Sequence, residues 1–212
     1  MHCCKKSLSR LLHSVLLVWL FSATAHAEGI SVNKAEVRLS EDGYHLAASY
    51  DIHLTFVVQQ ALARGIPLYF VNEFSLTRPR WYWFEEEVFV GEQTSRLSYN
   101  VLTRQYRISR GALFQNFVSF EDALNMLSRQ SSAAIPTGLI KQSDGYIAGL
   151  IRKIKTETSY FAVVRLRLDT DQLPKLLQVN AMTGNDWTLD SGWYRWVMRP
   201  EELPSRSEGK TE

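Results

Sequence analysis

The sequence predicts a mainly β protein with some α, built as a single antiparallel, sandwich-like domain of about eight strands with two or three short helices. Three observations support this fold class. Apolar and polar residues alternate with a period of two along several segments, which is typical of strands with one buried face. Many of these segments are joined by short turns. The helical patterns fall between groups of strands, which excludes a regular alternation of strand and helix.

The first two strands form a predicted hairpin. Apolar and charged residues alternate over 34–39, and residues 40–43 (Ser-Glu-Asp-Gly) supply a turn. Strict alternation then resumes over residues 44–54. Eleven residues with a period of two are a strong indication of a strand, so this pair is expected to form an antiparallel unit.

A short helix and two further strands are expected next. Thr55 is suited to cap the helix, and Gly65 followed by Pro67 is typical of a helix end. Residues 66–76 return to the strand pattern. Residues 80–90, which are rich in aromatic side chains, are interpreted as another strand.

A turn over 91–95 is predicted to lead into one long strand over 96–110. The apolar face of this strand changes partway, and a β-bulge near residues 101–102 accounts for the change because one extra residue re-aims every later side chain. Ser119 and Asp122 then match a capping box, which predicts the start of a second helix.

The segment that follows is the longest predicted loop. Residues 130–145 are polar and contain small residues. Residues 147–154 fit a third helix, but their β-branched content leaves helix and strand both open for residues 146–156. Alternation returns over residues 160–168, which are expected to form a strand.

The C-terminal part is predicted to hold the last two strands. Residues 169–174 (Asp-Thr-Asp-Gln-Leu-Pro) are typical of a turn. Strands are expected over 176–182 and 187–197, with a turn at residues 183–185 between them. The polar segment 199–212 is interpreted as a disordered tail.

The N-terminus has the features of a signal peptide. Lys5, Lys6 and Arg10 precede an apolar run over 11–21, and Ala25-His26-Ala27 matches a cleavage site. We expect cleavage after Ala27, with an uncleaved N-terminal anchor as the alternative. The expected organisation is therefore a signal peptide over 1–27, one domain over 28–198 and the tail.

Composition and charge exclude several classes of function. The chain is 45% apolar and 22% charged, which excludes a disordered or collagen-like protein. Beyond residue 27 it has 21 basic and 22 acidic residues, so electrostatic capture of nucleic acid is not expected. Both cysteines, Cys3 and Cys4, lie in the signal peptide. The exported part is therefore expected to lack disulfides, thiol chemistry and cysteine metal sites.

The titratable residues do not form a recognisable catalytic or metal-binding pattern. His45 and His53 lie eight residues apart on one predicted strand, a separation of about 26 Å, so they cannot share a metal ion. The acidic run 85–87 alternates between strand faces and does not converge. Asp169 and Asp171 fit a turn that binds backbone N–H groups. We therefore predict no catalytic residue, no cofactor and no metal.

Arginine and aromatic side chains are concentrated in several segments. They have two interpretations: a structural ladder of cation–π contacts, or a recognition surface, since Trp, Tyr and Arg dominate protein hot spots. The candidate binding surface consists of Arg80, Trp81, Trp83, Arg104, Tyr106, Trp187 and Trp193.

A series of motifs occurs in order along the chain. They are Arg80-Trp-Tyr-Trp-Phe-Glu85, Arg96-Leu-Ser-Tyr99, Leu102-Thr-Arg-Gln-Tyr-Arg107, Ser119-Phe-Glu-Asp-Ala-Leu124, Val164-Arg-Leu-Arg-Leu-Asp169, Gln172-Leu-Pro-Lys175, Gln178-Val179 and Asp186-Trp-Thr-Leu-Asp-Ser-Gly-Trp193. The series resembles the domain-of-unknown-function 4390 family of exported proteobacterial proteins, over nearly all of residues 30–198. The resemblance implies a periplasmic location in a Gram-negative cell. It also implies a role beside a sensor histidine kinase of the nitrogen-regulation type.

Two functions remain compatible with the sequence. The favoured one is a non-catalytic periplasmic binding or adaptor module that uses the Arg/Trp/Tyr surface, with an envelope or inner-membrane protein as its partner. This function predicts that at least two of five tryptophans are exposed: Trp81, Trp83, Trp187, Trp193 and Trp196. The alternative is a hydrolase of envelope glycans that uses Glu85 and Asp169, which requires the two carboxylates to lie about 5–10 Å apart in a cleft.

Overall fold

The computed structural model describes residues 29–79, 85–136, 140, 159–199 and 203. These residues form nine strands in two antiparallel sheets, together with three α-helices and two short 3-10 helices. The predicted mainly β, sandwich-like fold class is confirmed. The predictions for residues 1–27 and 146–156 lie outside the described residues, as does nearly all of the predicted tail.

Sheet A is the smaller sheet. Its strands are β1 (Gly29–Ser40), β2 (Gly43–His53) and β7 (Arg129–Ser131), in the order β1-β2-β7. The predicted hairpin is confirmed, because β1 and β2 pair antiparallel from Gly29 opposite His53 to Ser40 opposite Gly43. The short strand β7 lies at the free edge of β2.

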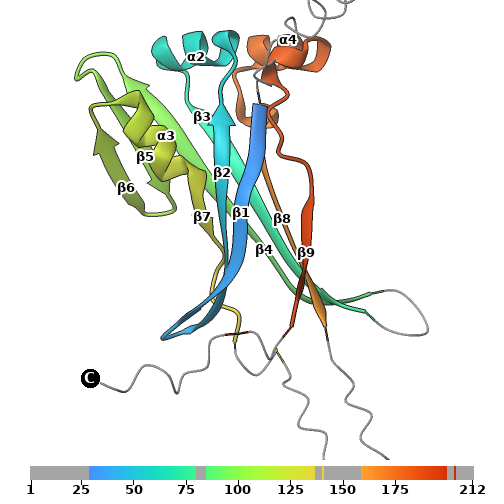
Figure 1. Ribbon diagram of the computed structural model, residues 1–212. Helices are drawn as coiled ribbons and strands as arrows, with labels where there is room; N and C mark the ends of the chain where they lie inside the picture. The colour runs from blue at the N-terminus through green and yellow to red at the C-terminus, as the bar shows by residue number, and fades with distance from the viewer. Residues whose placement is uncertain (1–28, 80–84, 137–139, 141–158, 200–202, 204–212) are drawn as a thin grey trace, which may run out of the picture.

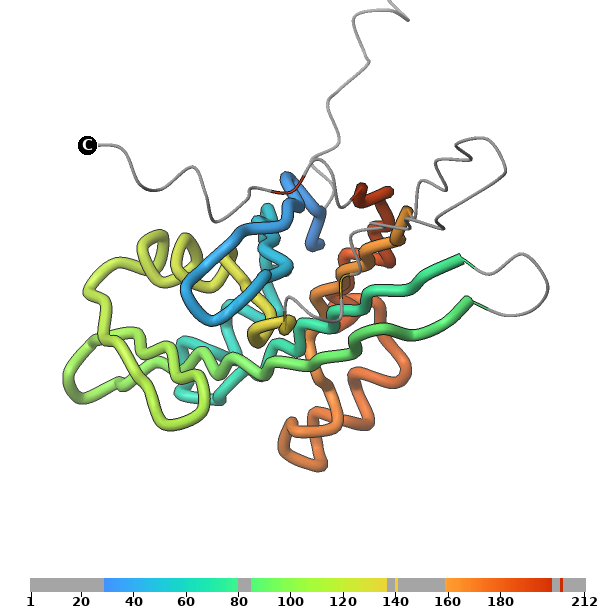
Figure 2. Tube along the Cα trace, turned by 90° about the horizontal axis from the view of Figure 1, so that it is seen from below, coloured from blue at the N-terminus to red at the C-terminus, as the bar shows by residue number. Residues whose placement is uncertain are grey.

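Sheet B has six strands in the order β6-β5-β4-β3-β8-β9. Their bounds are β3 (Leu68–Arg78), β4 (Glu86–Asn100), β5 (Gln105–Arg110), β6 (Leu113–Phe117), β8 (Tyr160–Leu168) and β9 (Tyr194–Met198). The hairpin β1–β2 lies in front of β3, β4 and β8 in Figure 1, and the view along the strands in Figure 2 separates the two layers. The sheets therefore cover each other as in a sandwich.

The hydrophobic core fills the space between the sheets. Alternate residues of the strands point into it, as the period of two predicts. The fully buried side chains include Leu46, Leu68, Phe70, Phe74, Leu76, Tyr160 and Leu166. Because β3 and β8 are neighbours near the centre of sheet B, their inner faces supply much of this core.

Two helices begin at the predicted caps. Helix α2 (Phe56–Ala63) is capped by Thr55, whose hydroxyl accepts a hydrogen bond from the N–H of Val58 at 3.3 Å. Helix α3 (Phe120–Ser128) is capped by Ser119, whose hydroxyl accepts from the N–H of Glu121 at 3.2 Å. Each hydroxyl satisfies an N–H group that has no partner inside the helix.

The predicted turn over 91–95 is wrong, because β4 continues through it. Gly91 lies opposite Phe74 of β3, and pairing with β3 extends on both sides of this position. The glycine has a packing role: a Cβ atom there would lie 2.9 Å from the ring of Phe89. Its missing side chain makes room for that ring within a regular strand.

The predicted long strand over 96–110 is also wrong, because a turn divides it. Strand β4 ends at Asn100, whose side-chain oxygen accepts hydrogen bonds from the N–H groups of Leu102 (2.9 Å) and Thr103 (3.2 Å). Arg104 has a φ of 54°, in the left-handed region that turns use. The change of apolar face therefore marks a hairpin turn and not a bulge.

The strand predicted over 176–182 is a helix, α4 (Lys175–Thr183). Leu177 and Ala181, one helical turn apart, are half-buried and pack against the core cluster, whereas Leu176 and Met182 are exposed. Apolar residues on both sides of a short segment give no clear period, so the sequence does not distinguish strand from helix here.

The last predicted strand is shorter than residues 187–197. A 3-10 helix, η3 (Asn185–Trp187), occupies its start, and β9 begins only at Tyr194. Between them, a single bridge joins Asp190 to Arg167 of β8.

The turn predicted over 169–174 contains the 3-10 helix η2 (Thr170–Gln172). It is capped by Asp169, whose side chain accepts a hydrogen bond from the N–H of Asp171 at 3.1 Å.

Candidate functional site

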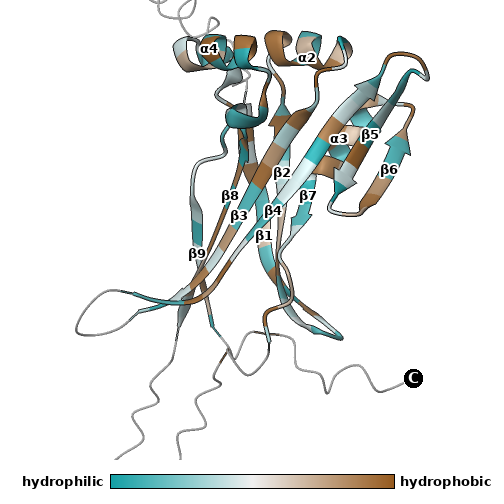
Figure 3. Cartoon of the chain, turned by 180° about the vertical axis from the view of Figure 1, so that it is seen from behind, coloured by the Kyte–Doolittle hydropathy of each residue, from teal (hydrophilic) through white to brown (hydrophobic). Residues whose placement is uncertain are grey.

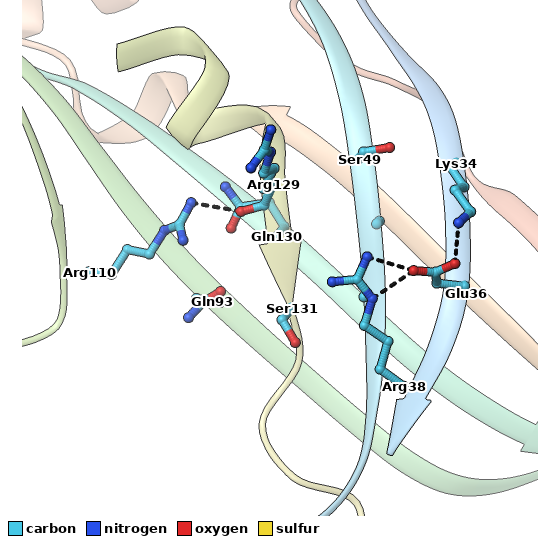
Figure 4. Close-up of a pocket in the computed structure, with 11 residues that line it drawn as sticks. Lys34, Glu36, Arg38, Ser49, Gln93, Arg110, Arg129, Gln130 and Ser131 are labelled. Atoms are coloured by element: carbon cyan, nitrogen blue, oxygen red, sulfur yellow. Dashed lines mark hydrogen bonds and ion pairs between the residues drawn. The ribbon is translucent and has the colours of Figure 1, made fainter. Parts of the chain in front are cut away.

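A cleft of about 340 Å³ opens where the edge strand of sheet A lies beside β4 and β5 of sheet B. Figure 4 shows side chains from both sheets around it. The lining residues are Lys34, Glu36 and Arg38 of β1, Ala47, Ala48 and Ser49 of β2, Arg129, Gln130 and Ser131 of β7, Gln93 of β4 and Arg110 of β5.

The strand register explains why there is space in this cleft. Along β2, Ala47 lies opposite Glu36 of β1 and Ser131 of β7, and Ser49 lies opposite Lys34 and Arg129. Side chains of paired residues stand on the same face of a sheet. Small residues in the middle strand therefore separate the long side chains of the two outer strands.

The cleft has an excess of positive charge. Four of its lining residues are basic, and Glu36 is the one acidic residue among them. The Glu36 carboxylate pairs with the Lys34 ammonium and accepts a hydrogen bond from Nε of Arg38 at 2.6 Å. The hydrogen bonds from Lys34 and Arg38 lower the pKa of Glu36. This acid is therefore already shared by two cations.

Arg110 is a half-buried cation whose described partners are all neutral. Its Nε donates to the Ser95 hydroxyl at 3.0 Å, and its Nη2 donates to the backbone carbonyls of Met126 (2.8 Å) and Arg129 (2.9 Å). Burial lowers the pKa of Arg110. Met126 lies in the last turn of α3, so the guanidinium also meets the partially negative end of that helix. No carboxylate of a described residue pairs with it.

A row of buried amides lies between the cleft and the core. Gln93 stands opposite Asn72 of β3, and the Tyr50 hydroxyl donates to the Asn72 side-chain oxygen at 2.9 Å. Gln93 Oε1 and Asn72 Nδ2 are buried without a hydrogen-bond partner in the described part of the chain. On the other side, Gln130 donates to the Leu127 carbonyl at 2.6 Å. The wall of the cleft is thus polar, and Gln93 in it has an unused acceptor.

The structure separates the residues of the sequence-predicted surface. Arg80, Trp81 and Trp83 lie outside the described residues. Trp187 is buried in the core, so it cannot contact a partner directly. The other three residues lie toward opposite ends of the strand order of sheet B.

Arg104 and Tyr106 lie at the β5 side of the sheet. Arg104 is exposed in the turn after β4, and the half-buried Tyr106 ring lies 4.8 Å from that of Tyr99 and 5.4 Å from that of Phe120. Trp193 precedes β9 and is 60% exposed, with the Arg165 guanidinium 4.9 Å from its ring centroid. Strands β4, β3 and β8 separate these positions.

Other arginine–aromatic pairs fit the structural interpretation of these side chains. The guanidinium of Arg195 lies 3.7 Å from the Phe161 ring centroid, and that of Arg107 lies 4.9 Å from the Phe114 ring centroid. Both pairs join neighbouring strands of sheet B. Trp196 of β9 is half-buried, which leaves Trp193 as the one largely exposed tryptophan that the structure describes.

Glu85 and Asp169 do not form the carboxylate pair that the hydrolase alternative requires. Glu85 accepts a hydrogen bond from the Thr77 hydroxyl at 2.8 Å, whereas the Asp169 N–H donates to the Tyr69 carbonyl at 2.7 Å. Thr77 and Tyr69 are eight residues apart on β3, which is about 26 Å. Neither acid lines the cleft.

His45 and His53 have separate partners. His45 contacts the Ser132 carbonyl through Nδ1 and the Asp42 carboxylate through Nε2, both at 2.9 Å. The hydrogen bond to Asp42 raises the pKa of His45. Nε2 of His53 lies 3.2 Å from the carboxylate of Asp51. In the part of the chain that the structure describes, no three residues of the metal-binding types cluster.

Sequence reasoning misses the residues that form the cleft. The alternating polar side of residues 34–38 predicts a strand face, and it does supply one wall. The other wall needs Gln93, Arg110 and Arg129, which come from three different strands. No local pattern links them, because only the register of the two sheets brings them together.

The fold and the cleft define a sandwich-like β protein with a cationic cleft at the junction of its two sheets. Residues 27–197 match the family described as a domain of unknown function (DUF4390), and the chain belongs to that family. This confirms the resemblance that the sequence motifs indicated. No curated protein and no solved structure matches the chain.

Proposed function

We propose that this chain is a non-catalytic binding or adaptor module of the periplasm and that its inter-sheet cleft binds an anionic group of the ligand or partner. The observation that carries this proposal is Arg110, a half-buried guanidinium with neutral partners only among the described residues. A buried charge without a counter-ion is unfavourable, so an incoming carboxylate or phosphate gains the interaction that the chain leaves unused.

The rest of the cleft supports the same ligand chemistry. Arg129 is exposed at the mouth and forms no ion pair with a described residue, and Lys34 and Arg38 share one carboxylate. The volume of about 340 Å³ is at the small end of the range for ligand pockets. It suits a small anion, or an acidic side chain that a partner protein inserts.

The proposed location and partner follow from the sequence. A signal peptide cleaved after Ala27 places the domain in the periplasm, where an envelope or inner-membrane protein is the expected partner. An accessory role to a membrane sensor kinase is part of the proposal. None of the helices described here is long and apolar enough to cross a bilayer.

Binding of inorganic phosphate and acetate to the purified protein, followed by calorimetry, tests the cleft. We expect Arg129→Gln to weaken binding about tenfold, because it removes one exposed charge of the cleft. Glu36→Gln is expected to strengthen binding about threefold, since it releases Lys34 and Arg38 from their shared carboxylate. The matched control is Arg64→Gln, which removes an exposed arginine just after α2 and is expected to leave binding unchanged.

Photocrosslinking in the native envelope tests the adaptor role. A crosslinker at Ser131 is expected to capture one partner in the wild type and in Arg64→Gln but not in Arg129→Gln. Equal anion affinity and equal crosslinking in the two arginine variants would contradict the proposal.

A further inference from the structure

One end of the molecule carries exposed apolar side chains from three separate elements. On α4, Leu176 is 85% exposed and Met182 is 88% exposed, with the exposed Val179 between them. A spacing of three residues places these side chains on one side of the helix. The opposite side, with Leu177, packs against the core.

Helix α2 and the turn between β4 and β5 add to the same end. Phe56 of α2 is exposed, and Leu102 of the turn is 94% exposed, the highest value among the large apolar side chains described. Figure 1 shows α2 and α4 at the same end with the β4–β5 turn nearby, and Figure 3 shows hydrophobic segments on both helices.

Side-chain contacts hold the three elements in this arrangement. The Thr55 hydroxyl, at the start of α2, donates to the Asp186 carbonyl of η3 at 2.7 Å, and η3 follows α4 directly. Beyond the other end of α2, the backbone passes close to the turn: a Cβ atom at Gly65 would lie 3.7 Å from the Val101 side chain. The apolar side chains therefore project together from a fixed base.

The path of the chain indicates what covers this end. Gly29, the first residue of β1, lies opposite His53, two residues before Thr55. Only residues 22–28 separate Gly29 from the apolar run 11–21, and seven residues span at most about 25 Å. When that run lies in the membrane during export, before the proposed cleavage after Ala27, the end with α2 and α4 is the part of the domain held next to the bilayer.

We propose that this end of the domain lies against a lipid bilayer, with the exposed side of α4 and the tip of the β4–β5 turn inserted among the headgroups. Two short helices and a turn project apolar side chains outward, which suits shallow insertion. Asp171 and Asp186 offset most of the positive charge of Lys175, Arg64 and Arg104 at this end, so anionic lipids are not the main requirement for binding. This inference is independent of the cleft.

Fluorescence quenching in vesicles of phosphatidylcholine tests the proposal. The exported chain that the proposed cleavage leaves, residues 28–212, has no cysteine of its own and is labelled with an environment-sensitive dye through Leu176→Cys. The control label is placed through Val118→Cys, a comparably exposed apolar position between β6 and α3. With a quencher in the upper part of the acyl chains, we expect at least threefold stronger quenching at position 176 than at position 118.

A charged variant sharpens the result. Met182→Glu is expected to reduce quenching of the label at position 176 by at least half, and Leu113→Glu on β6 is expected to leave it unchanged. Both positions are exposed, so neither substitution is expected to affect folding. Melting temperatures equal to that of the unsubstituted chain would verify this. Equal quenching at positions 176 and 118 would overturn the proposal. So would an unquenched label at position 176, including one buried by dimerisation of the chain.

Discussion

The arginines on the outer face of sheet B differ from those in the cleft. Arg165 of β8 pairs with Asp190 and also lies 3.6 Å from the carboxylate of Glu73. Arg195 of β9 pairs with Glu85. In the cleft, Arg110 has only carbonyls and a hydroxyl as partners among the described residues. The β8–β9 part of the outer face thus pairs its arginines with acids, whereas Arg110 in the cleft has no such partner among the described residues.

This difference shows why the density of arginine is a poor guide to a binding site. On β8 and β9 these charges are matched by acids, so the arginines there link strands and leave little net attraction for a ligand. In the cleft, the same side chain remains electrostatically unmatched. Three substitutions test this contrast, from the largest expected effect to the smallest.

Arg110→Met should give the largest loss of stability. It leaves the carbonyls of Met126 and Arg129 without their donor, although it also removes a half-buried charge. Hydrogen bonds from a charged donor contribute about 1.5–3 kcal/mol, so we expect a net loss of about 2 kcal/mol in urea unfolding. Arg129→Met, which removes an exposed side chain, should cost less than about 0.5 kcal/mol. Equal losses would contradict a special role for Arg110.

Asp190→Asn should have an intermediate, pH-dependent effect. The hydrogen bond from Arg165 lowers the pKa of Asp190, so the carboxylate adds stability above its unfolded pKa, about 3.8, and loses it as the pH falls through the lower folded value. We expect the variant to be about 1 kcal/mol less stable at pH 7, a figure reduced for partial solvent screening. In unfolding curves, the gap should begin to narrow as the pH falls below about 4 and close once the pH is below the folded pKa of Asp190. A gap that is constant with pH would exclude the ion pair as its cause.

His45→Gln should have the smallest effect, with the opposite dependence on pH. His45 lies opposite Arg38, at the rim of the cleft, and its raised pKa comes mainly from the hydrogen bond with Asp42. Its contribution is therefore complete below its unfolded pKa, about 6.5, and is lost as the pH rises through the folded value. We expect a difference of about 0.5 kcal/mol or less between pH 5.5 and pH 8.5. In an Asp42→Asn background this pH dependence should disappear.

The local features of the fold are predictable from the sequence, but features that depend on distant pairing are not. Thr55 and Ser119 cap helices because their hydroxyls reach N–H groups two or three residues away. Gly91 resembles a turn residue in the sequence, yet its role is to make room for Phe89 while pairing with β3 keeps the strand extended. Helix α4 is not predicted because apolar residues lie on both sides of the helix and give no clear period of three to four residues.

The candidate site shows the same limit. Trp187 and Trp193 are the same residue type in neighbouring segments, yet one is buried and the other is largely exposed. The sequence contains no signal for this difference, which arises from the packing of η3 beside α2. Arg110 and Arg129 likewise become a pair of cleft residues only when α3 folds back between β5 and β2.

The pairing of β3 with β8 also governs the order in which the chain can fold. Phe70 lies opposite Leu168, and Thr77 lies opposite Phe161, so these partners are separated by more than eighty residues of sequence. The β1–β2 and β3–β4 hairpins have local partners, but their apolar sides stay uncovered until the second half of the chain is present. Closing such a long loop slows folding and prolongs exposure to aggregation. A chain truncated before Tyr160 should therefore accumulate as an aggregation-prone intermediate that needs a chaperone to stay in solution.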